Sequence, residues 1–278
     1  MYHKIVSHQL ATIINFCSND RFFIHHAIRQ AKKFSCQIIA SYCDHFYDGT
    51  PENIKIINKI ITSHPQVKFI PFQYDPKATK NLWRGWQFIL RHLTKTKVWG
   101  PQYWICRARF LGAAYLKDNI DYVLFLDADE VPDGKRFKAW LDTKDYQNYN
   151  GLKPSNYWYF RSPKYQAAIF EDSALLAKKS ALKSAVFMDH DERNATYNSI
   201  TGPKKRMVMG LDNQPLIHHY GWAKPKSNLL KKVQTWGHAK DRNWVKLIQK
   251  EFSKPFSGTD FIYKRKYKIV TPWLSLNH

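Results

Sequence analysis

An uninterrupted apolar run, Tyr122 to Leu126, ends directly in Asp127, Ala128 and Asp129. A continuous apolar run of this length is typical of a central strand in a parallel sheet that is covered on both faces. Ligands of open α/β sheets bind at the carboxyl ends of such strands. The two carboxylates therefore predict a site for Mn²⁺ or Mg²⁺, which would clamp the phosphates of a nucleotide. An ordinary acidic turn is the alternative interpretation.

Three further segments are predicted strands: residues 10–16, 36–42 and 67–72. Helical patterns separate them. Asp20 is expected to cap a first helix, Pro51 to open a second, and residues 102–117 to form a third. This alternation predicts an α/β fold of three layers with a mostly parallel central sheet.

The charge of the chain limits its partners. With 278 residues it can bury one sizeable core, and its formal net charge of +22 favours nucleotides, nucleic acid or an anionic membrane surface. The four cysteines lack metal-ligand or redox spacing and are expected to be reduced thiols. No segment predicts a membrane span, and residues 1–4 do not predict a signal peptide, so a cytoplasmic protein is expected.

Three motifs follow one another along the first half: Asp44-x-x-x-Asp48-Gly49-Thr50, Arg107 to Gly112, and Asp127 to Glu130. Their order resembles that of the GT-A fold glycosyltransferases, a Rossmann-like fold, and in particular the glycosyltransferase two family, which uses nucleotide-sugar donors. In that family the first acid of the D-G-S-x-D-G-T loop contacts the nucleobase or ribose, which implies this role for Asp44. This chain departs from the family at His45, Phe46 and Phe110, which replace Gly, Ser and Asn.

The second half resembles one branch of that family, the lipopolysaccharide-core β-glucosyltransferases. His190-Asp191-Glu192 corresponds to an H-E pair with one inserted acid, and His219 to Trp222 corresponds to an H-Y-x-Y-like segment. The resemblance implies an inverting enzyme that moves a sugar, with a UDP-sugar as the expected donor, to a hydroxyl of a glycan or glycolipid. It also implies a catalytic domain over residues 1–222, with a helical and basic extension over residues 223–278 packed on it.

The leaving nucleoside diphosphate needs its charge neutralised. A cation held by Asp129, with help from Asp127, would do this, and Asp129 is expected to lie at a strand end outside the core. His219 can offer a neutral imidazole to the cation or contact the diphosphate. In an extended segment, His218 would point elsewhere.

Two arginines lie on the predicted helix that precedes Asp127 to Glu130, the segment called here the acidic loop. Either Arg107 or Arg109 could reach a phosphate, because a guanidinium group matches phosphate oxygens. Solvation of the helix face is an equally open interpretation.

An inverting transfer needs a base for the proton of the acceptor hydroxyl. Glu192 or Asp191 is expected to fill this role, since a carboxylate near an apolar wall can be tuned toward the working pH. Asp172 is the second candidate, and an ordinary charged loop at residues 190–193 is the alternative.

Aromatic and basic segments suggest further contacts. Residues 156–161 could form a platform for the acceptor, because sugar rings stack their C–H faces on aromatic rings. The basic stretch Lys264 to Lys268 suggests peripheral contact with an anionic membrane, although a solvated charged surface is the default interpretation.

Two other function classes stay open. A metal-dependent nucleotidyltransferase would share the sheet and the carboxylates, but no Gly-rich, Lys-containing phosphate loop follows the first strand. A nucleic-acid-binding protein would explain the charge but would not need carboxylates at strand ends, so no nucleic-acid partner is expected.

Overall fold

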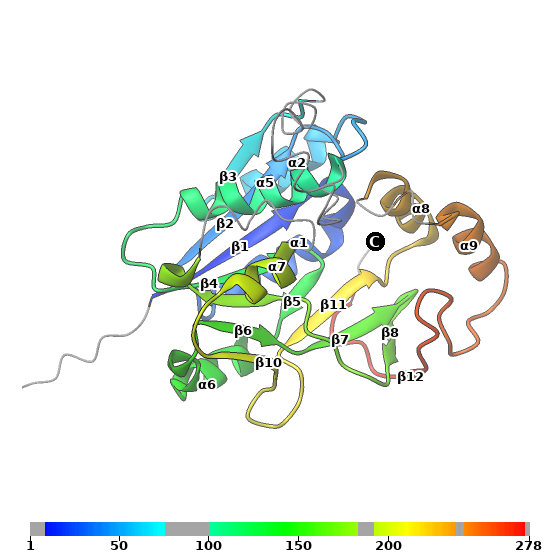
Figure 1. Cartoon of the computed structure of the whole chain (residues 1–278). Helices are drawn as coiled ribbons and strands as arrows, with labels where there is room; N and C mark the ends of the chain where they lie inside the picture. The colour runs from blue at the N-terminus through cyan, green and yellow to red at the C-terminus, as the bar shows by residue number, and fades with distance from the viewer. Residues whose placement is uncertain (1–8, 76–99, 183–191, 237–238, 240–241, 276–278) are drawn as a thin grey trace, which may run out of the picture.

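The computed structural model describes residues 9–75, 100–182, 192–236, 239 and 242–275. These residues form two β-sheets. Helices cover both faces of the larger sheet, and two C-terminal helices lie beside the smaller one (Figure 1). Within the described part of the chain, no helix is both long and apolar enough to cross a membrane.

The larger sheet has the strand order β10-β6-β9-β4-β1-β2-β3. These strands are β1 (Leu10–Phe16), β2 (Gln37–Cys43), β3 (Lys68–Phe72), β4 (Tyr122–Asp127), β6 (Gly151–Pro154), β9 (Leu175–Lys178) and β10 (Lys204–Val208). The predicted strands are thus confirmed to within a residue. β4, β1, β2 and β3 run parallel, and Asn15 pairs with Asp127, so β1 and β4 end side by side. The mostly parallel sheet is confirmed.

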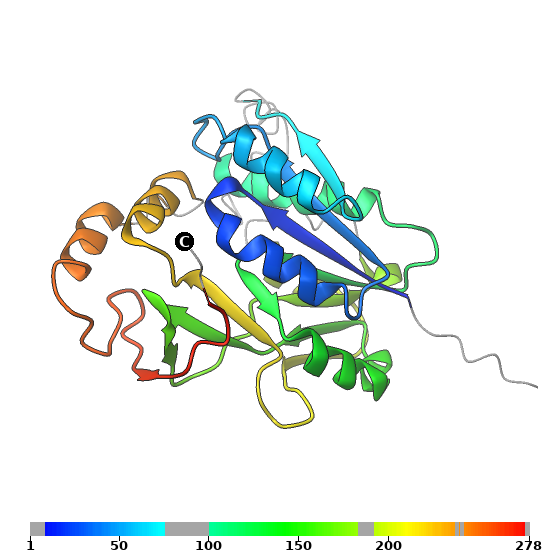
Figure 2. The same cartoon turned by 180° about the vertical axis from the view of Figure 1, so that it is seen from behind.

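Alternate residues of the central strands feed two apolar layers. Ile14 packs in one cluster with residues of α1 (Arg21–Ala31) and α2 (Ile54–Ser63), and α6 (Gly134–Asp142) contacts α1. Ile13 packs on the other face with residues of α5 (Gly100–Ala114) and α7 (Glu192–Ser199). Figures 1 and 2 show these helices on opposite faces, which confirms the three-layer α/β fold.

The smaller sheet has the strand order β12-β8-β7-β11-β5. These strands are β5 (Glu130–Pro132), β7 (Asn156–Phe160), β8 (Ser162–Ala167), β11 (Ile217–Trp222) and β12 (Tyr267–Ile269). Because β4 ends at Asp127 and β5 begins at Glu130, the acidic loop is a connection from the larger sheet to the smaller one.

The C-terminal region combines helices with a strand. α8 (Lys226–Thr235) and α9 (Trp244–Glu251) pack through Leu229 and Ile248 against Trp222 of the smaller sheet. Beyond α9, β12 pairs antiparallel with β8. The predicted helical extension therefore contains helices, and it also completes the smaller sheet.

Asp20 is the N-cap residue of α1, as predicted, but without a side-chain capping bond, and the second predicted helix start is displaced. Asp20 ends a 3₁₀ turn, η1 (Ser18–Asp20), and its side chain makes no capping bond to α1. It accepts hydrogen bonds from Cys17 and Lys224 instead, because a buried ammonium group competes for the same oxygens. α2 begins three residues after Pro51, where the Asn53 side chain accepts a bond from Ile56 N. Two further 3₁₀ turns are η2 (Asp145–Asn148) and η3 (Lys179–Ala181).

Candidate active site

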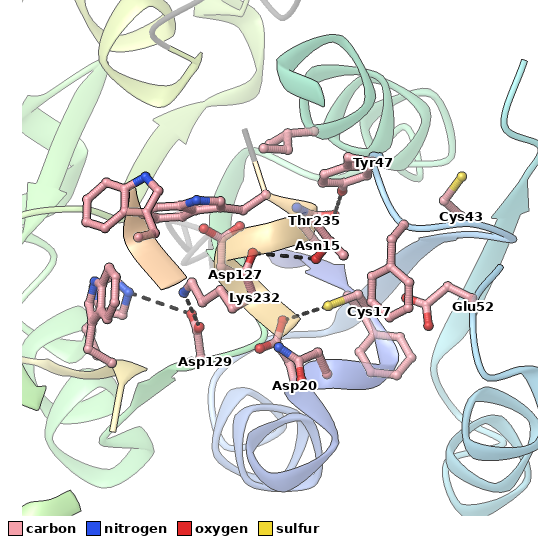
Figure 3. A pocket seen from close by; sticks show the side chains of 18 of the residues that line it. Asn15, Cys17, Asp20, Cys43, Tyr47, Glu52, Asp127, Asp129, Lys232 and Thr235 are labelled. Carbon is pink, nitrogen blue, oxygen red and sulfur yellow. Dashed lines mark hydrogen bonds and ion pairs between the residues drawn. The ribbon is translucent and has the colours of Figure 1, made fainter. Parts of the chain in front are cut away.

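A cavity of about 500 Å³ opens at the carboxyl ends of β1, β2 and β4. One wall comes from the larger sheet and includes Asn15, Cys17, Tyr47 and Glu52. The opposite wall comes from β7, β11, α8 and the segments that follow α8. Asp127 and Asp129 line the cavity in the loop that connects the two sheets (Figure 3).

Asp127 is held by two arginines. Its Oδ1 accepts a bond of 2.6 Å from Arg109 Nη2, and its Oδ2 accepts one of 3.2 Å from Arg193 Nη2. Burial by itself would raise the pKa of Asp127, but the guanidinium groups of Arg193 and Arg109 outweigh it and keep the pKa below its usual value. Asp127 is therefore an ionised anchor for the loop.

Asp129 lies among lysines rather than at an exposed strand end. The residue is only 4% exposed, which overturns the expectation that it lies outside the core. Its Oδ2 accepts bonds of 3.0 Å from Lys224 Nζ and 3.3 Å from Lys232 Nζ. Burial would raise the pKa of Asp129, but the charges of Lys232 and Lys224, with His219, hold the pKa well below its usual value.

The two lysines differ in exposure. The Lys224 side chain is fully buried and is also paired with Asp20, so it joins the turn after β1 to the acidic loop. The Lys232 side chain is 20% exposed and lines the cavity, where Figure 3 shows it next to Asp129. Only Lys232 of this pair can meet a ligand in the cavity.

Glu130 adds a buried carboxylate behind the loop. It is 0% exposed; its Oε2 accepts a bond of 2.8 Å from Asp127 N and one of 2.5 Å from Arg193 Nη1. Sequence reasoning noted Glu130 only as part of the motif, and it missed Arg193 and Lys224 as site residues. No local pattern marks a lysine that will be buried, so only its position directly after β11 could have drawn attention to Lys224.

The adjacent histidines point to opposite faces of β11. His219 lies in the cavity, with Nε2 at 3.6 Å from Asp129 Oδ1 and Nδ1 at 3.9 Å from Glu130 Oε1. His218 is buried, with Nδ1 2.7 Å from the Tyr159 hydroxyl and its ring stacked on Trp273. Burial lowers the pKa of His218 to about 3, so this imidazole is neutral.

Gly221 leaves room for the groups around Asp129. A Cβ at this position would lie 2.8 Å from His219 Nε2 and 3.2 Å from Lys232 Nζ. Any larger residue would push the imidazole and the ammonium group away from the carboxylate. Glycine therefore preserves a small space bordered by a carboxylate, an imidazole and a cation.

The donor set around this space suits a divalent cation in part. Asp129 Oδ1 and His219 Nε2 face each other, and a carboxylate with an imidazole suits Mn²⁺. Asp127 is less available because both of its oxygens bind arginines. Among the residues that the structure describes, no group of three or more His, Cys, Asp or Glu side chains is arranged as a metal site. The structure thus joins two of the three predicted ligands.

The predicted nucleotide contacts lie at different depths. The Asp44 carboxylate accepts a bond of 2.7 Å from Tyr74 N and lies 2.9 Å from His45 Nδ1. His45 lines the cavity, whereas Asp44 is not among the lining residues. Arg107 donates to the Tyr103 hydroxyl and also lies outside the lining, and the Arg109 side chain is buried against Asp127.

The candidate bases are separated. Asp172 binds Arg206 through two bonds of 2.9 and 2.8 Å and is not among the residues that line the cavity. Glu192 is the first residue of α7, and Asp191 lies outside the described residues. Arg193 follows Glu192 directly and reaches both Asp127 and Glu130, so the start of α7 is fixed beside the acidic loop.

The predicted aromatic platform is divided between two faces of β7. Trp158 lines the cavity and contacts the His219 ring at 4.7 Å between centroids. Tyr157 and Tyr159 instead pack against His218. Of this platform, only Trp158 belongs to the site.

Comparisons with known proteins add little. No family model matches the chain, and no curated protein matches it. Solved structures that share part of its arrangement include three from different organisms. They are a 4-diphosphocytidyl-2C-methyl-D-erythritol synthase from Anaerococcus prevotii, the mannosyltransferase PcManGT from Pyrobaculum calidifontis in complex with GDP-Man and Mn²⁺, and the glycosyltransferase GlyE of Streptococcus pneumoniae.

All three likenesses are distant. The sequence identities are 10%, 9% and 13%, and the TM-scores are 0.43, 0.43 and 0.40. The matches cover 75%, 83% and 89% of this chain and 92%, 62% and 64% of the respective structures, so the chain spans less than two thirds of the two glycosyltransferases.

Proposed function

We propose that this chain is a glycosyltransferase that moves a sugar from a nucleotide-sugar donor to a hydroxyl of a glycan or glycolipid. One observation carries the proposal: a buried acidic loop crosses from one sheet to the other at the middle of a cavity. The wall from the larger sheet offers polar groups for a nucleotide, and the wall from the smaller sheet is aromatic. The acidic loop and its basic neighbours lie between them, where a diphosphate would join the nucleoside to the sugar.

The nucleoside is proposed to lie against the wall of the larger sheet. Tyr47, which follows β2, donates a bond of 3.1 Å to Oδ1 of Asn15 near the end of β1. This bond fixes both polar side chains at the cavity wall. Asp44 is proposed to act through His45, because it holds that ring at the cavity wall. Glu52 accepts bonds from Ser18 N and Asn53 N, so it joins the two loops that would surround the ribose.

The diphosphate is proposed to meet Lys232 and a divalent cation, Mn²⁺ or Mg²⁺, that Asp129 and His219 would hold. Such a cation, when bound, would help to neutralise the charge of the leaving diphosphate. Lys232 adds a positive charge from α8. Lys224 keeps Asp129 ionised and in place, while Arg109 and Arg193 do the same for Asp127. These cations are preorganised, so little rearrangement is needed as charge develops.

The transfer is proposed to be a single displacement. The acceptor oxygen attacks the anomeric carbon, the bond from that carbon to the diphosphate oxygen breaks, and a base takes the hydroxyl proton. Glu192 or Asp191 is the proposed base, and the tie of Arg193 to the acidic loop supports this placement. Asp172 is a weaker candidate because Arg206 occupies its carboxylate.

A screen of nucleotide sugars tests the proposal. The intact chain is incubated with UDP-, GDP-, ADP- and CMP-sugars in Mn²⁺, in Mg²⁺ or in excess chelator, and both the release of the nucleotide and the melting temperature are recorded. One donor should raise the melting temperature and release its nucleotide only with metal, since ligands that bind the native state stabilise it. Release of sugar 1-phosphate from a UDP-, GDP- or ADP-sugar, by transfer of the nucleotidyl group, would instead indicate a nucleotidyltransferase, and salt-sensitive oligonucleotide binding without turnover would indicate a nucleic-acid-binding protein.

Asp129→Asn provides the matched variant, because it keeps the size of the side chain in its buried place. It should remove metal-dependent turnover. Asp142→Asn serves as the control, since Asp142 is exposed on α6, where it pairs with Lys138. Full turnover in Asp129→Asn would overturn the proposed role of the acidic loop.

A further inference from the structure

The wall of the cavity contributed by the smaller sheet and the C-terminal region is built from aromatic rings. Its members are Trp158, Trp222, Trp236, Trp244 and Tyr263, here called the aromatic wall. These rings come from β7, β11 and the segments after α8, whereas the proposed nucleoside loops follow β1 and β2.

Edge-to-face contacts fix the rings relative to one another. Trp236 meets Trp222 at 5.5 Å and Trp244 at 5.3 Å between centroids, in both cases close to perpendicular. Trp158 meets Tyr263 at 5.8 Å in the same way. Aromatic pairs prefer this geometry, and interlocked rings lose little further freedom when a ligand binds. The aromatic wall is thus preorganised.

Tyr263 presents an open surface despite these contacts. The Arg265 guanidinium lies 4.3 Å from the Tyr263 ring centroid and is paired with Glu171. The residue nevertheless remains 52% exposed. Tyr263 is therefore held from one side by a fixed cation while part of its surface stays available to a ligand in the cavity.

Polar groups border the aromatic wall. Thr235 and Arg242 also line the cavity, and Lys232 Nζ lies 5.8 Å from the Trp236 ring centroid. His219 contacts the edge of Trp158. A pyranose ring has apolar C–H faces and a rim of hydroxyls, so aromatic surfaces beside a few donors and acceptors match both of its parts.

We propose that Trp236 and Tyr263, held by the buried rings of Trp158, Trp222 and Trp244, form a subsite for a sugar ring of the acceptor. The inference rests on the proposed function for its place in the reaction. It follows from the lining of the cavity, which combines the loops after β1 and β2, the acidic loop with Lys232, and the aromatic wall. A sugar bound at the aromatic wall presents its hydroxyl toward the position of the diphosphate.

Saturation-transfer NMR with simple glycosides tests this subsite directly. The probes are the methyl α- and β-glycosides of glucose, galactose, mannose and N-acetylglucosamine, each added with and without UDP and Mn²⁺. At least one should bind through its C–H face. Tyr263→Ala and Trp236→Ala should each weaken this binding about tenfold, the change that follows from loss of about 1.4 kcal/mol of ring contact. Tyr115→Ala is the matched control, because Tyr115 is 46% exposed and lies outside the cavity lining.

The outcomes separate the subsite from the proposed function. Glycoside binding that is sensitive to Tyr263 supports the subsite even if no nucleotide sugar is turned over, in which case the proposed function fails alone. Absence of glycoside binding in both conditions overturns the subsite. Equal binding by Tyr263→Ala, Trp236→Ala and the control also overturns it. Loss of nucleotide affinity in both aromatic variants would assign the wall to the nucleoside and overturn it as well.

Discussion

The acids of the site and most of its cations come from different regions of the chain. Asp20 and Asp129 follow strands of the larger sheet, and Asp127 is the last residue of one. Arg193, Lys224 and Lys232 come from α7, the segment after β11, and α8. Arg109 on α5 is the exception, as a cation supplied by the first region. The acidic loop is thus completed only when the second region of the chain, which includes α7, β11 and α8, packs against the first region, which includes β1 to β4.

This difference shows how the free-energy cost of the buried carboxylates is lowered in this protein. An unpaired charge in a protein interior costs several kcal/mol, whereas a paired and hydrogen-bonded charge costs far less. Asp129 is 4% exposed and Glu130 is 0% exposed, so each depends on cations delivered from later in the chain. The second region therefore contributes to stability and to the site through the same residues.

The proposed base would break this pattern, because it is an acid supplied by the second region. Glu192→Gln should lower turnover by a factor on the order of 10² to 10⁴ with donor affinity nearly unchanged, since a general base acts mainly in the transition state. Asp191→Asn and Asp172→Asn are measured beside it. If only Asp191→Asn shows this signature, the base lies one residue earlier.

Analysis of the product anomer accompanies these variants. A single displacement inverts the anomeric centre, so NMR of the product should show inversion. Retention of configuration would refute the base mechanism for every one of these carboxylates.

Comparison of Lys224 with Lys232 tests whether stability and binding are divided between the two lysines. Lys224→Met should lower the free energy of unfolding by about 3–5 kcal/mol, because it leaves Asp20 and Asp129 facing each other without the buried cation. Lys232→Met should cost less than about 1 kcal/mol, since its side chain is partly exposed, but it should weaken nucleotide binding. Urea unfolding and calorimetry measure the two effects. Equal losses of stability would remove the distinction.

The two histidines sharpen the contrast between the faces of β11. His219→Ala should weaken nucleoside diphosphate binding in Mn²⁺ at least about tenfold, the lower range for loss of a group that supports a metal site. His218→Asn should leave that affinity within about twofold. Calorimetry with and without Mn²⁺ decides the matter, and an unchanged affinity in His219→Ala would return His219 to a structural role.

The buried histidine also predicts a pH dependence. The pKa of His218 is about 3 in the folded protein and 6.5 as the ordinary value, so the unfolded state binds more protons between these limits. Stability therefore falls as the pH drops through this window, by about 2 kcal/mol from pH 6.5 to pH 5 for this one group. His218→Asn should show a shallower decline in urea unfolding over the same range. Parallel curves for the two proteins would contradict the assignment.

The smallest effect is expected at the basic C-terminal stretch. Lys264, Lys266 and Lys268 are exposed, whereas Arg265 pairs with Glu171 and packs between Trp158 and Tyr263. Neutralising each lysine should weaken binding to anionic vesicles by at most about 1 kcal/mol, and salt should reduce binding further. Co-sedimentation measures this, and binding that ignores both salt and the lysines would leave the stretch as a solvated surface.

Local sequence identified the parallel part of the larger sheet well. Residues 10–16 are mostly apolar and residues 122–126 are a continuous apolar run because both faces of β1 and β4 are buried, and such segments leave little freedom in assigning a strand. Asp127 and Asp129 could be placed at the strand end for the same reason. The smaller sheet was not predicted as a separate unit, since β5 has three residues and β12 has three, too few to show a period.

The sequence by itself thus determined the order of the motifs along the chain, the position of the acidic loop and the opposite directions of His218 and His219. The first two depend on short-range burial, and the third depends on the alternation of side chains in an extended strand. Only the tertiary structure decided which cations surround the acids. Lys224 and Lys232 lie 95 and 103 positions from Asp129 along the chain. An ion pair depends on distance in space, and neither lysine differs locally from the many that remain in solvent, so packing of the second region on the first was needed to reveal them.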